Sequence, residues 1–275
     1  MSENLKYEFA EGDTVVLAPG RTLKRIRALT AIALFGVTPG DLGGYIEDSK
    51  NLSVHGDAWV SGNARVSGDA WVSGNARVHG DAWVSGDAQV YGNARVYGNA
   101  RVSGDARVSG DAQVYGNARV YGDARVYGDA RVYGNARVYG NAQVSGDAQV
   151  YGNARVYGDA WVSGNARVSG DAQVYGNAWV YGDAWVYGDA RVYGNARVYG
   201  ETSKTPLQIG GLRWQVTITD TDMSIGCQSH PLANWLAFSD DQIRAMDHYV
   251  LEFWQKHKQL ILGLAEADGR LGVAK

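Results

Sequence analysis

The chain has 275 residues, enough for one or two ordinary domains, but its 37 glycines and 17 tyrosines against 4 phenylalanines indicate a repeat instead. Its 26 basic and 29 acidic residues give a formal net charge of -3, so overall charge supplies no attraction to nucleic acid or to an anionic membrane. No apolar stretch is long enough to span a bilayer, and the single cysteine, Cys227, cannot form an internal disulfide. We therefore expect a cytoplasmic chain that does not enter a membrane.

Residues 1–48 do not share the pattern that follows them and are assigned to an N-terminal cap of β structure. Residues 21–29 alternate between polar and apolar side chains, which is typical of a strand. Residues 40–44 are rich in glycine and predict a turn that leads into the repeat.

Residues 55–198 form 24 consecutive hexads of the form [Tyr/Ser/His]-Gly-[Asn/Asp]-Ala-[Arg/Trp/Gln]-Val, without an insertion or deletion. Alanine and valine lie two apart, so in an extended chain both point to the same side. Gly-Asn or Gly-Asp supplies a corner, because these residues tolerate unusual backbone angles. A unit of one short strand and one corner cannot bury a core alone, so the hexads must stack on one another. We assign residues 49–204 to a solenoid.

The repeat resembles the hexapeptide-repeat family of left-handed parallel β-helices, in which three hexads form one triangular coil of 18 residues. The resemblance implies an all-β solenoid of about eight coils, with the valine and alanine side chains pointing inward. At the usual strand spacing of roughly 4.8 Å this prism is about 38 Å long. Its two ends would expose unpaired strand edges, which predicts a cap at each end.

Residues 205–275 are assigned to a C-terminal cap of mixed α and β structure. Residues 212–218 and 223–226 are predicted to form two paired strands, and residues 231–238 a short helix. Ser239 and Gln242 form a capping box, which predicts that a helix begins there. Its apolar stripe comprises Ile243, Met246, Val250, Phe253, Trp254, His257, Leu260, Ile261 and Leu264. We expect this long amphipathic helix to lie across the last coil.

Both flanks are similar to those of proteins encoded by phages and prophages that carry [YS]G[ND]A repeats. The matching segments are RIRAL at residues 25–29 and GDLGGYIE at residues 40–47. In the C-terminal flank they are Gly226-Cys227 with His230, Trp235 with Phe238, and Ile243 with Met246. The resemblance implies a phage or prophage origin, and hence the cytoplasm of a bacterial host. It implies no particular function.

Taking every third hexad assigns the outward side chains to three faces, counted from the hexad that begins at His55. The second face has four consecutive arginines beside a column that becomes all tyrosine, and these are the candidate binding residues: Arg101, Arg119, Arg137, Arg155, Tyr121, Tyr139, Tyr157 and Tyr175. Such a stripe could hold phosphates or a nucleic-acid backbone. The alternative is that the arginines stack on tyrosine and pair with corner aspartates, which makes only a soluble sheet.

Two further clusters are candidates on the same assignment. One corner column contains Asp69, Asp87, Asp105 and Asp123, which repel one another unless a divalent cation neutralises them or the side chains spread into water. Exposed aromatic residues near the C-terminal end of the repeat indicate an interface: Trp161, Trp179, Tyr181 and Trp185. Self-association is the commonest use of such a surface, so a homo-oligomer is expected.

The histidines and the cysteine give little indication of catalysis. His55 and His79 fall on different faces, whereas a hexapeptide acyltransferase uses a histidine base supported by loops that interrupt the coils, and no loop interrupts these hexads. A zinc-dependent carbonic anhydrase on the same fold would need three histidines that converge on one metal. Cys227 and His230 lack an identifiable third group. We therefore expect a non-enzymatic binding or scaffolding protein without a cofactor.

Its partner is expected to be a host protein, a nucleotide or a nucleic acid, and a host-directed role against bacterial defence is one version of this hypothesis. An acyltransferase-like enzyme and a self-assembling structural rod are the alternatives.

Overall fold

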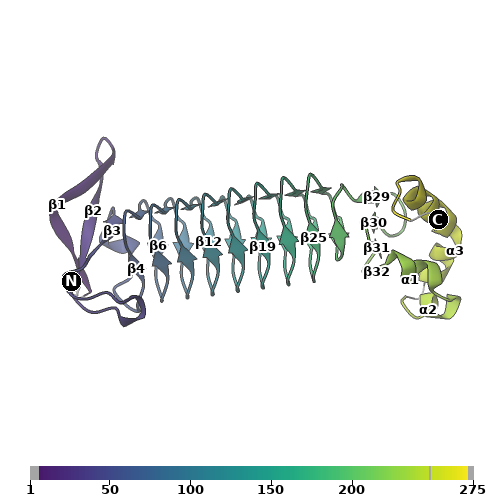
Figure 1. Cartoon of the computed structure of the whole chain (residues 1–275), viewed down its shortest axis with the longest axis horizontal. Helices are drawn as coiled ribbons and strands as arrows, with labels where there is room; N and C mark the ends of the chain where they lie inside the picture. Colours follow the sequence, from purple (N-terminus) through teal and green to yellow (C-terminus); the bar gives the residue numbers. More distant parts are fainter. Residues whose placement is uncertain (1–5, 248, 272–275) are drawn as a thin grey trace.

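The computed structural model describes residues 6–247 and 249–271. Three parallel sheets run along a straight prism, with a β hairpin at its N-terminal end and a small α+β unit at its C-terminal end (Figure 1). Paired residues lie 18 apart, as in Arg101 with Arg119, so each coil contains three hexads. The expected parallel β-solenoid with a cap at each end is confirmed, with nine strands on each of two faces and eight on the third.

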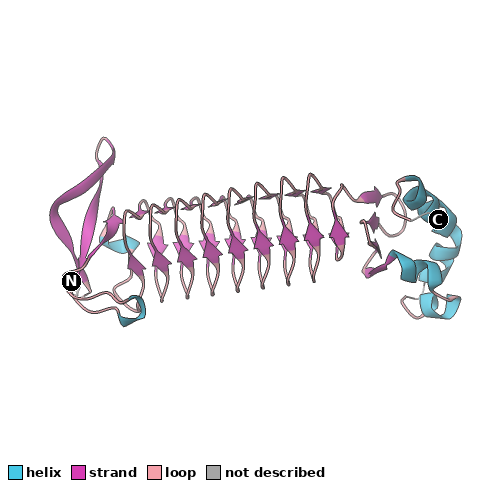
Figure 2. Cartoon of the chain, viewed as in Figure 1, coloured by secondary structure: helices cyan, strands magenta, loops and turns pink. Residues whose placement is uncertain are grey.

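The strands of the prism are short, and each face consists of every third one (Figure 2). The first face comprises β4 (Trp59–Val60), β7 (Arg77–Val78), β10 (Arg95–Val96), β13 (Gln113–Val114), β16 (Arg131–Val132), β19 (Gln149–Val150), β22 (Arg167–Val168), β25 (Trp185–Val186) and β28 (Glu201–Thr202). The second comprises β3 (Leu42–Ile46), β5 (Arg65–Val66), β8 (Trp83–Val84), β11 (Arg101–Val102), β14 (Arg119–Tyr121), β17 (Arg137–Tyr139), β20 (Arg155–Val156), β23 (Gln173–Val174) and β26 (Arg191–Val192). The third comprises β6 (Trp71–Val72), β9 (Gln89–Val90), β12 (Arg107–Val108), β15 (Arg125–Val126), β18 (Gln143–Val144), β21 (Trp161–Val162), β24 (Trp179–Val180) and β27 (Arg197–Val198).

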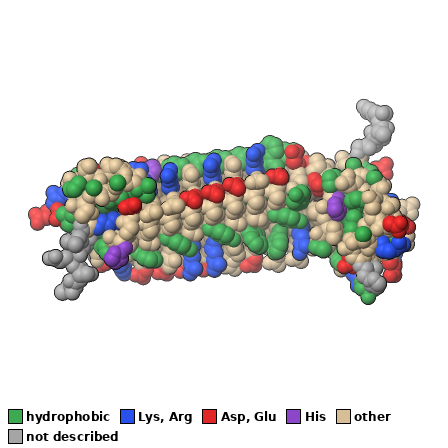
Figure 3. Space-filling view, turned by 90° about the horizontal axis from the view of Figure 1, so that it is seen from below, with side chains coloured by type: hydrophobic (Ala, Val, Ile, Leu, Met, Phe, Trp, Pro, Cys, Tyr) green, Lys and Arg blue, Asp and Glu red, His purple; other side chains and the backbone are tan. Residues whose placement is uncertain are grey.

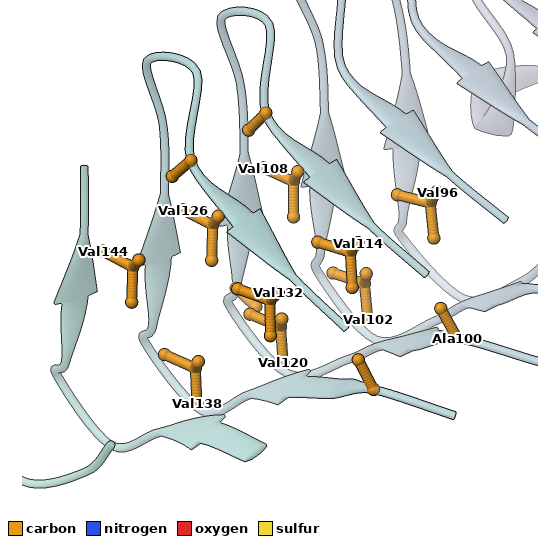
Figure 4. Close-up of a cluster of buried hydrophobic side chains, with 14 of the residues drawn as sticks. Val96, Ala100, Val102, Val108, Val114, Val120, Val126, Val132, Val138 and Val144 are labelled. Atoms are coloured by element: carbon orange, nitrogen blue, oxygen red, sulfur yellow. The ribbon is translucent and has the colours of Figure 1, made fainter. Parts of the chain in front are cut away.

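The core of the prism consists of the valine and alanine side chains of the hexads, and every one of them is fully buried. Valines from all three faces point toward the axis (Figure 4). Burying one valine side chain contributes about 1.5 kcal/mol or more. Stability therefore accumulates coil by coil, and the outward side chains are left free to differ from hexad to hexad.

The corners explain why every hexad keeps its glycine. Gly134 has a φ of 68°, a conformation that residues with a Cβ rarely adopt. A Cβ added to Gly134 would lie 3.1 Å from the backbone nitrogen of Gly152 in the next coil. The corner amides also connect coils, since Asn135 Nδ2 donates a hydrogen bond to Asn153 Oδ1 at 3.2 Å.

The N-terminal cap is an antiparallel hairpin of β1 (Tyr7–Ala18) and β2 (Arg21–Ala28), and β2 pairs with β3. Two short 3-10 turns follow, η1 (Ala33–Phe35) and η2 (Ser49–Asn51). The strand predicted for residues 21–29 is therefore confirmed.

The turn predicted for residues 40–44 is wrong beyond Gly40, because β3 begins at Leu42. Gly43 and Gly44 are needed for close packing, since a Cβ on either would lie within 2.6 Å of a neighbouring atom.

The C-terminal cap begins with an antiparallel sheet of four strands: β29 (Leu207–Ile209), β30 (Val216–Ile218), β31 (Asp222–Ile225) and β32 (Gln228–Pro231). Pairing of β30 with β31 was expected, but the first predicted strand is three residues long rather than seven, and β29 and β32 were not foreseen. Three helices follow: α1 (Leu232–Ala237), α2 (Asp240–Arg244) and α3 (Val250–Ala267). The predicted short helix and the capping box at Ser239 are both present.

Two expectations about the terminal helix are wrong. The predicted single helix is broken between Arg244 and Val250, where the Asp247 side chain accepts a hydrogen bond from the backbone of Tyr249 and so competes with the helical pattern. The helix also packs on the four-stranded sheet, in a core separate from that of the prism. The sheet, through β31, contacts the last coil instead: the Ser224 hydroxyl donates to the carbonyl of Arg197 (Figure 1). Leu260 and Leu264 of the predicted stripe are consequently exposed.

Among the described residues, no helix is both long and apolar enough to cross a membrane.

Candidate binding surfaces of the prism

The arginine column of the second face lies where the hexad count put it. Arg101, Arg119, Arg137 and Arg155 occupy neighbouring strands in register, and all four side chains are exposed. Neighbouring strands are about 4.8 Å apart, so the four cations extend over roughly 14 Å. We call these four residues the arginine ladder.

The charges of the ladder are not neutralised within the prism. Across residues 55–198, all of which the structure describes, no arginine forms an ion pair with a corner aspartate. The pairing proposed in the soluble-sheet alternative is therefore absent. In the view of Figure 3, a row of acidic side chains runs along the prism with basic side chains beside it rather than among it.

The corner residues of the sequence already indicate that most arginines are not preceded by an aspartate. Of the 13 arginines in the hexads, nine follow an asparagine two positions earlier, and only four follow an aspartate. All four arginines of the ladder follow asparagine, at positions 99, 117, 135 and 153. Aspartate corners mostly precede tryptophan or glutamine, so the corner before each ladder strand is neutral, whereas the corner after it carries Asp105, Asp123 or Asp159 in three of the four coils.

The tyrosines beside the ladder form a continuous ring stack. Tyr121, Tyr139, Tyr157 and Tyr175 stack with centroids 4.9 Å apart and ring planes within 3° of parallel. Burial raises the pKa of Tyr139 and Tyr157 above the ordinary value, so these phenols stay protonated at neutral pH. Because the facing sides of successive rings cover one another, the column offers mainly edges and hydroxyls to a partner, and the N-terminal side of Tyr121 is the ring face not covered by another tyrosine.

A diagonal packing rule connects neighbouring coils. The side chain at the first position of a hexad (Tyr, Ser or His) lies beside the side chain sixteen residues later in the next coil, which is at the fifth position of its own hexad (Arg, Trp or Gln). Where the later residue is tryptophan, its indole N–H donates to a small serine, as from Trp83 to Ser67, Trp161 to Ser145 and Trp185 to Ser169, at 3.0 to 3.1 Å. Where the earlier residue is tyrosine, its hydroxyl can donate to a glutamine, as from Tyr133 to Gln149 at 3.1 Å.

Of the predicted interface residues, Trp161, Trp179 and Tyr181 come together and Trp185 does not. The first three line a pocket of 290 Å³ on the third face, together with Ser163 and Arg197. We call it the junction pocket, because Arg197 also lines a second pocket of 360 Å³ against the C-terminal sheet. Trp185 belongs to the first face, where it packs on Tyr187. Arg197 and Ser163 were not foreseen, although the sixteen-residue rule identifies Ser163.

The column of corner aspartates was one candidate for a cation site. Within residues 6–247 and 249–271, no group of three or more side chains of the ligand type converges. Asp69 forms an ion pair with Lys50 instead, and both lie in a polar pocket at the N-terminal end of the second face. Asp69, Asp87, Asp105 and Asp123 are therefore not part of such a group, and the reading in which their carboxylates spread into water stays a prediction.

The titratable side chains considered for catalysis lie in structural surroundings. The His79 ring stacks on Tyr97 at 5.0 Å, and burial together with Arg77 and Arg95 lowers its pKa. The His230 ring packs edge-on against Trp235 and Phe238. Cys227 is exposed beside the second pocket. Of the segments that resemble phage proteins in the C-terminal flank, Trp235 and Ile243 are buried in the core of the cap, and Phe238 and Met246 pack against it.

The comparisons with known proteins agree with this architecture. A family model described as the YdcK β-solenoid repeat matches the chain ten times, at residues 58–74, 70–86, 88–103, 100–116, 112–128, 118–132, 130–146, 148–164, 172–188 and 190–203. A search of curated proteins found no match. The matches lie within the prism and not within the caps. The chain is therefore a β-solenoid repeat protein whose repeats are similar to the YdcK β-solenoid repeat.

Proposed function

We propose that this protein is a non-enzymatic binding scaffold that holds a nucleic acid by its phosphate backbone along the arginine ladder. The observation that carries the proposal is the uncompensated charge of Arg101, Arg119, Arg137 and Arg155 on a rigid face. At a separation of about 4.8 Å in water, neighbouring unit charges repel by roughly 0.9 kcal/mol. A polyanion that lies along the ladder removes this repulsion.

The closed tyrosine stack favours backbone recognition over base recognition. The facing sides of its rings are already covered, and the Tyr157 hydroxyl donates to Gln173, so the chemistry left on this surface is mainly that of the guanidinium groups and the other phenols, which suit phosphate oxygens. Binding of this kind does not depend on sequence. It also does not require single strands.

The two flanks support a finer version of the proposal. Their resemblance to phage and prophage proteins suggests a chain that acts in the cytoplasm of a bacterial host, on host nucleic acid or against a host defence. The scaffold is also proposed to work as a homo-oligomer, because exposed aromatic side chains commonly mark a self-association surface. The packing of His79 and His230 supports a role without catalysis.

The test is the affinity of the purified chain for a labelled 20-base-pair duplex and for its single strand, measured by fluorescence anisotropy over a range of salt. If all four arginines contact phosphates, the logarithm of the affinity falls against the logarithm of salt with a slope of about -3.6. A variant with all four arginines changed to glutamine loses most of that slope. Glutamine occupies this position in several native hexads, so the prism keeps its packing.

The matched control changes four arginines on the other two faces, Arg95, Arg107, Arg125 and Arg131, to glutamine. It removes the same charge and should leave binding within about twofold once the change in net charge is allowed for. Absence of duplex binding by the unmodified chain at low salt, or an equal loss in the control, would refute the proposal. Capture of a protein partner that requires the ladder would then support the protein-binding alternative.

A further inference from the structure

The junction pocket breaks the diagonal packing rule of the prism. Trp179 lies sixteen residues after Ser163, as the rule requires, yet its indole N–H does not donate to that hydroxyl. Its ring instead stands at 71° to the ring of Trp161, with centroids 5.2 Å apart, and the side chain is 42% exposed. The other three such pairs make the hydrogen bond.

The break leaves unused hydrogen-bonding groups on the pocket wall. Neither the Trp179 Nε1–H nor the Ser163 hydroxyl has a hydrogen-bond partner among the residues that the structure describes. Both residues line the same 290 Å³ space, together with Trp161. Apolar walls with a few convergent polar groups are the usual composition of a small-molecule site.

Arg197 gives the pocket its charge preference. Its guanidinium lies over the Trp179 ring at 5.3 Å and donates one long hydrogen bond, of 3.4 Å, to the carbonyl of Gly226. No carboxylate of the described chain lies within ion-pair distance of it. The corner residue before it, Asn195, is neutral. Burial raises the pKa of Tyr181, which keeps the last polar group of the pocket an uncharged phenol.

We propose that the junction pocket binds a small planar aromatic carboxylate, with its ring against Trp161 and Trp179 and its carboxylate on Arg197. The Trp179 N–H and the Ser163 hydroxyl supply further donors. The volume admits a ligand of one or two fused rings, at the small end of ordinary ligand sites. The site lies on the third face, so it is independent of the arginine ladder on the second.

Isothermal titration calorimetry of the full chain with 2-naphthoate and 2-naphthamide tests this. The two probes share a ring system and differ in charge at neutral pH. A hydrogen bond to a charged group is worth about 1.5 to 3 kcal/mol, so naphthoate should bind at least about tenfold more tightly than naphthamide. Arg197→Gln should abolish that difference, and Trp179→Gln should weaken both probes by about tenfold.

Trp185→Gln is the matched control, because it removes a tryptophan from the first face with the same substitution. It should leave both affinities unchanged. Circular dichroism of each variant verifies folding, and glutamine is native to this position of the repeat. Equal binding of the two probes, no binding of naphthoate at millimolar concentration, an unchanged preference in Arg197→Gln, or an equal loss in Trp185→Gln would each overturn the proposal.

Discussion

Replacing Ser145 by tyrosine tests whether the diagonal contacts between coils stabilise the prism. Ser145 is nearly buried, and its hydroxyl accepts the hydrogen bond of the Trp161 indole at 3.0 Å. A tyrosine there removes the small acceptor and forces Trp161 off its position. Losing the hydrogen bond costs about 1 kcal/mol, and displacing the ring by overpacking costs about 1 to 3 kcal/mol. We expect a total loss of about 2 to 4 kcal/mol of unfolding free energy.

Two companion variants separate the contributions. Ser145→Ala removes only the acceptor and should cost about 1 kcal/mol. Ser103→Tyr makes the same change where the diagonal neighbour is Arg119, and the new ring can extend the stack that begins at Tyr121. It should change stability by less than about 1 kcal/mol.

The assay is urea denaturation followed by circular dichroism, with amide hydrogen exchange of β18 and β21 as a local measure, because repeat arrays can unfold in parts. A Ser145→Tyr variant as stable as the unmodified chain would refute the packing rule. An equal loss from Ser103→Tyr would show that a tyrosine is disruptive at any serine position, whatever its diagonal neighbour.

Two other predictions concern the corners and the N-terminal cap. Gly134→Ala places a Cβ 3.1 Å from the next coil at a φ of 68°, and should cost about 2 kcal/mol or more by thermal denaturation. Gly263→Ala, in open space on α3, should instead stabilise the chain by up to about 1 kcal/mol; a loss at Gly263 as large as at Gly134 would contradict the strain argument. Hydrogen bonds from Arg21 and from the Gly68 backbone lower the pKa of Glu47 from 4.5 to about 2. The unfolded chain therefore takes up this proton first as the pH falls, so the stabilisation by Glu47 is complete above pH 4.5 and is lost between 4.5 and about 2. Glu47→Gln should flatten acid denaturation in that window, as measured by denaturation midpoints at each pH, and an unchanged pH profile would show that Glu47 is not responsible.

The local chemistry of the hexad determined most of the fold. Alanine and valine two positions apart fixed the inward face, and Gly-Asn or Gly-Asp fixed the corner. With three hexads to a coil, counting alone put Arg101, Arg119, Arg137 and Arg155 in one column. Counting was sufficient because each coil of a solenoid contacts only the coils next to it, so the position of a residue in the sequence gives its position along the prism.

The caps and the detailed surface were decided by tertiary contacts. The break between α2 and α3 depends on the Asp247 side chain, and the packing of α3 depends on a four-stranded sheet of which two strands carried no clear pattern. The coverage of the tyrosine faces and the turned ring of Trp179 depend on which side chain lies sixteen or eighteen residues away. A periodic pattern determines on which face and in which coil a residue lies. The neighbouring side chains in space determine its rotamer and which of its atoms remain available for a partner.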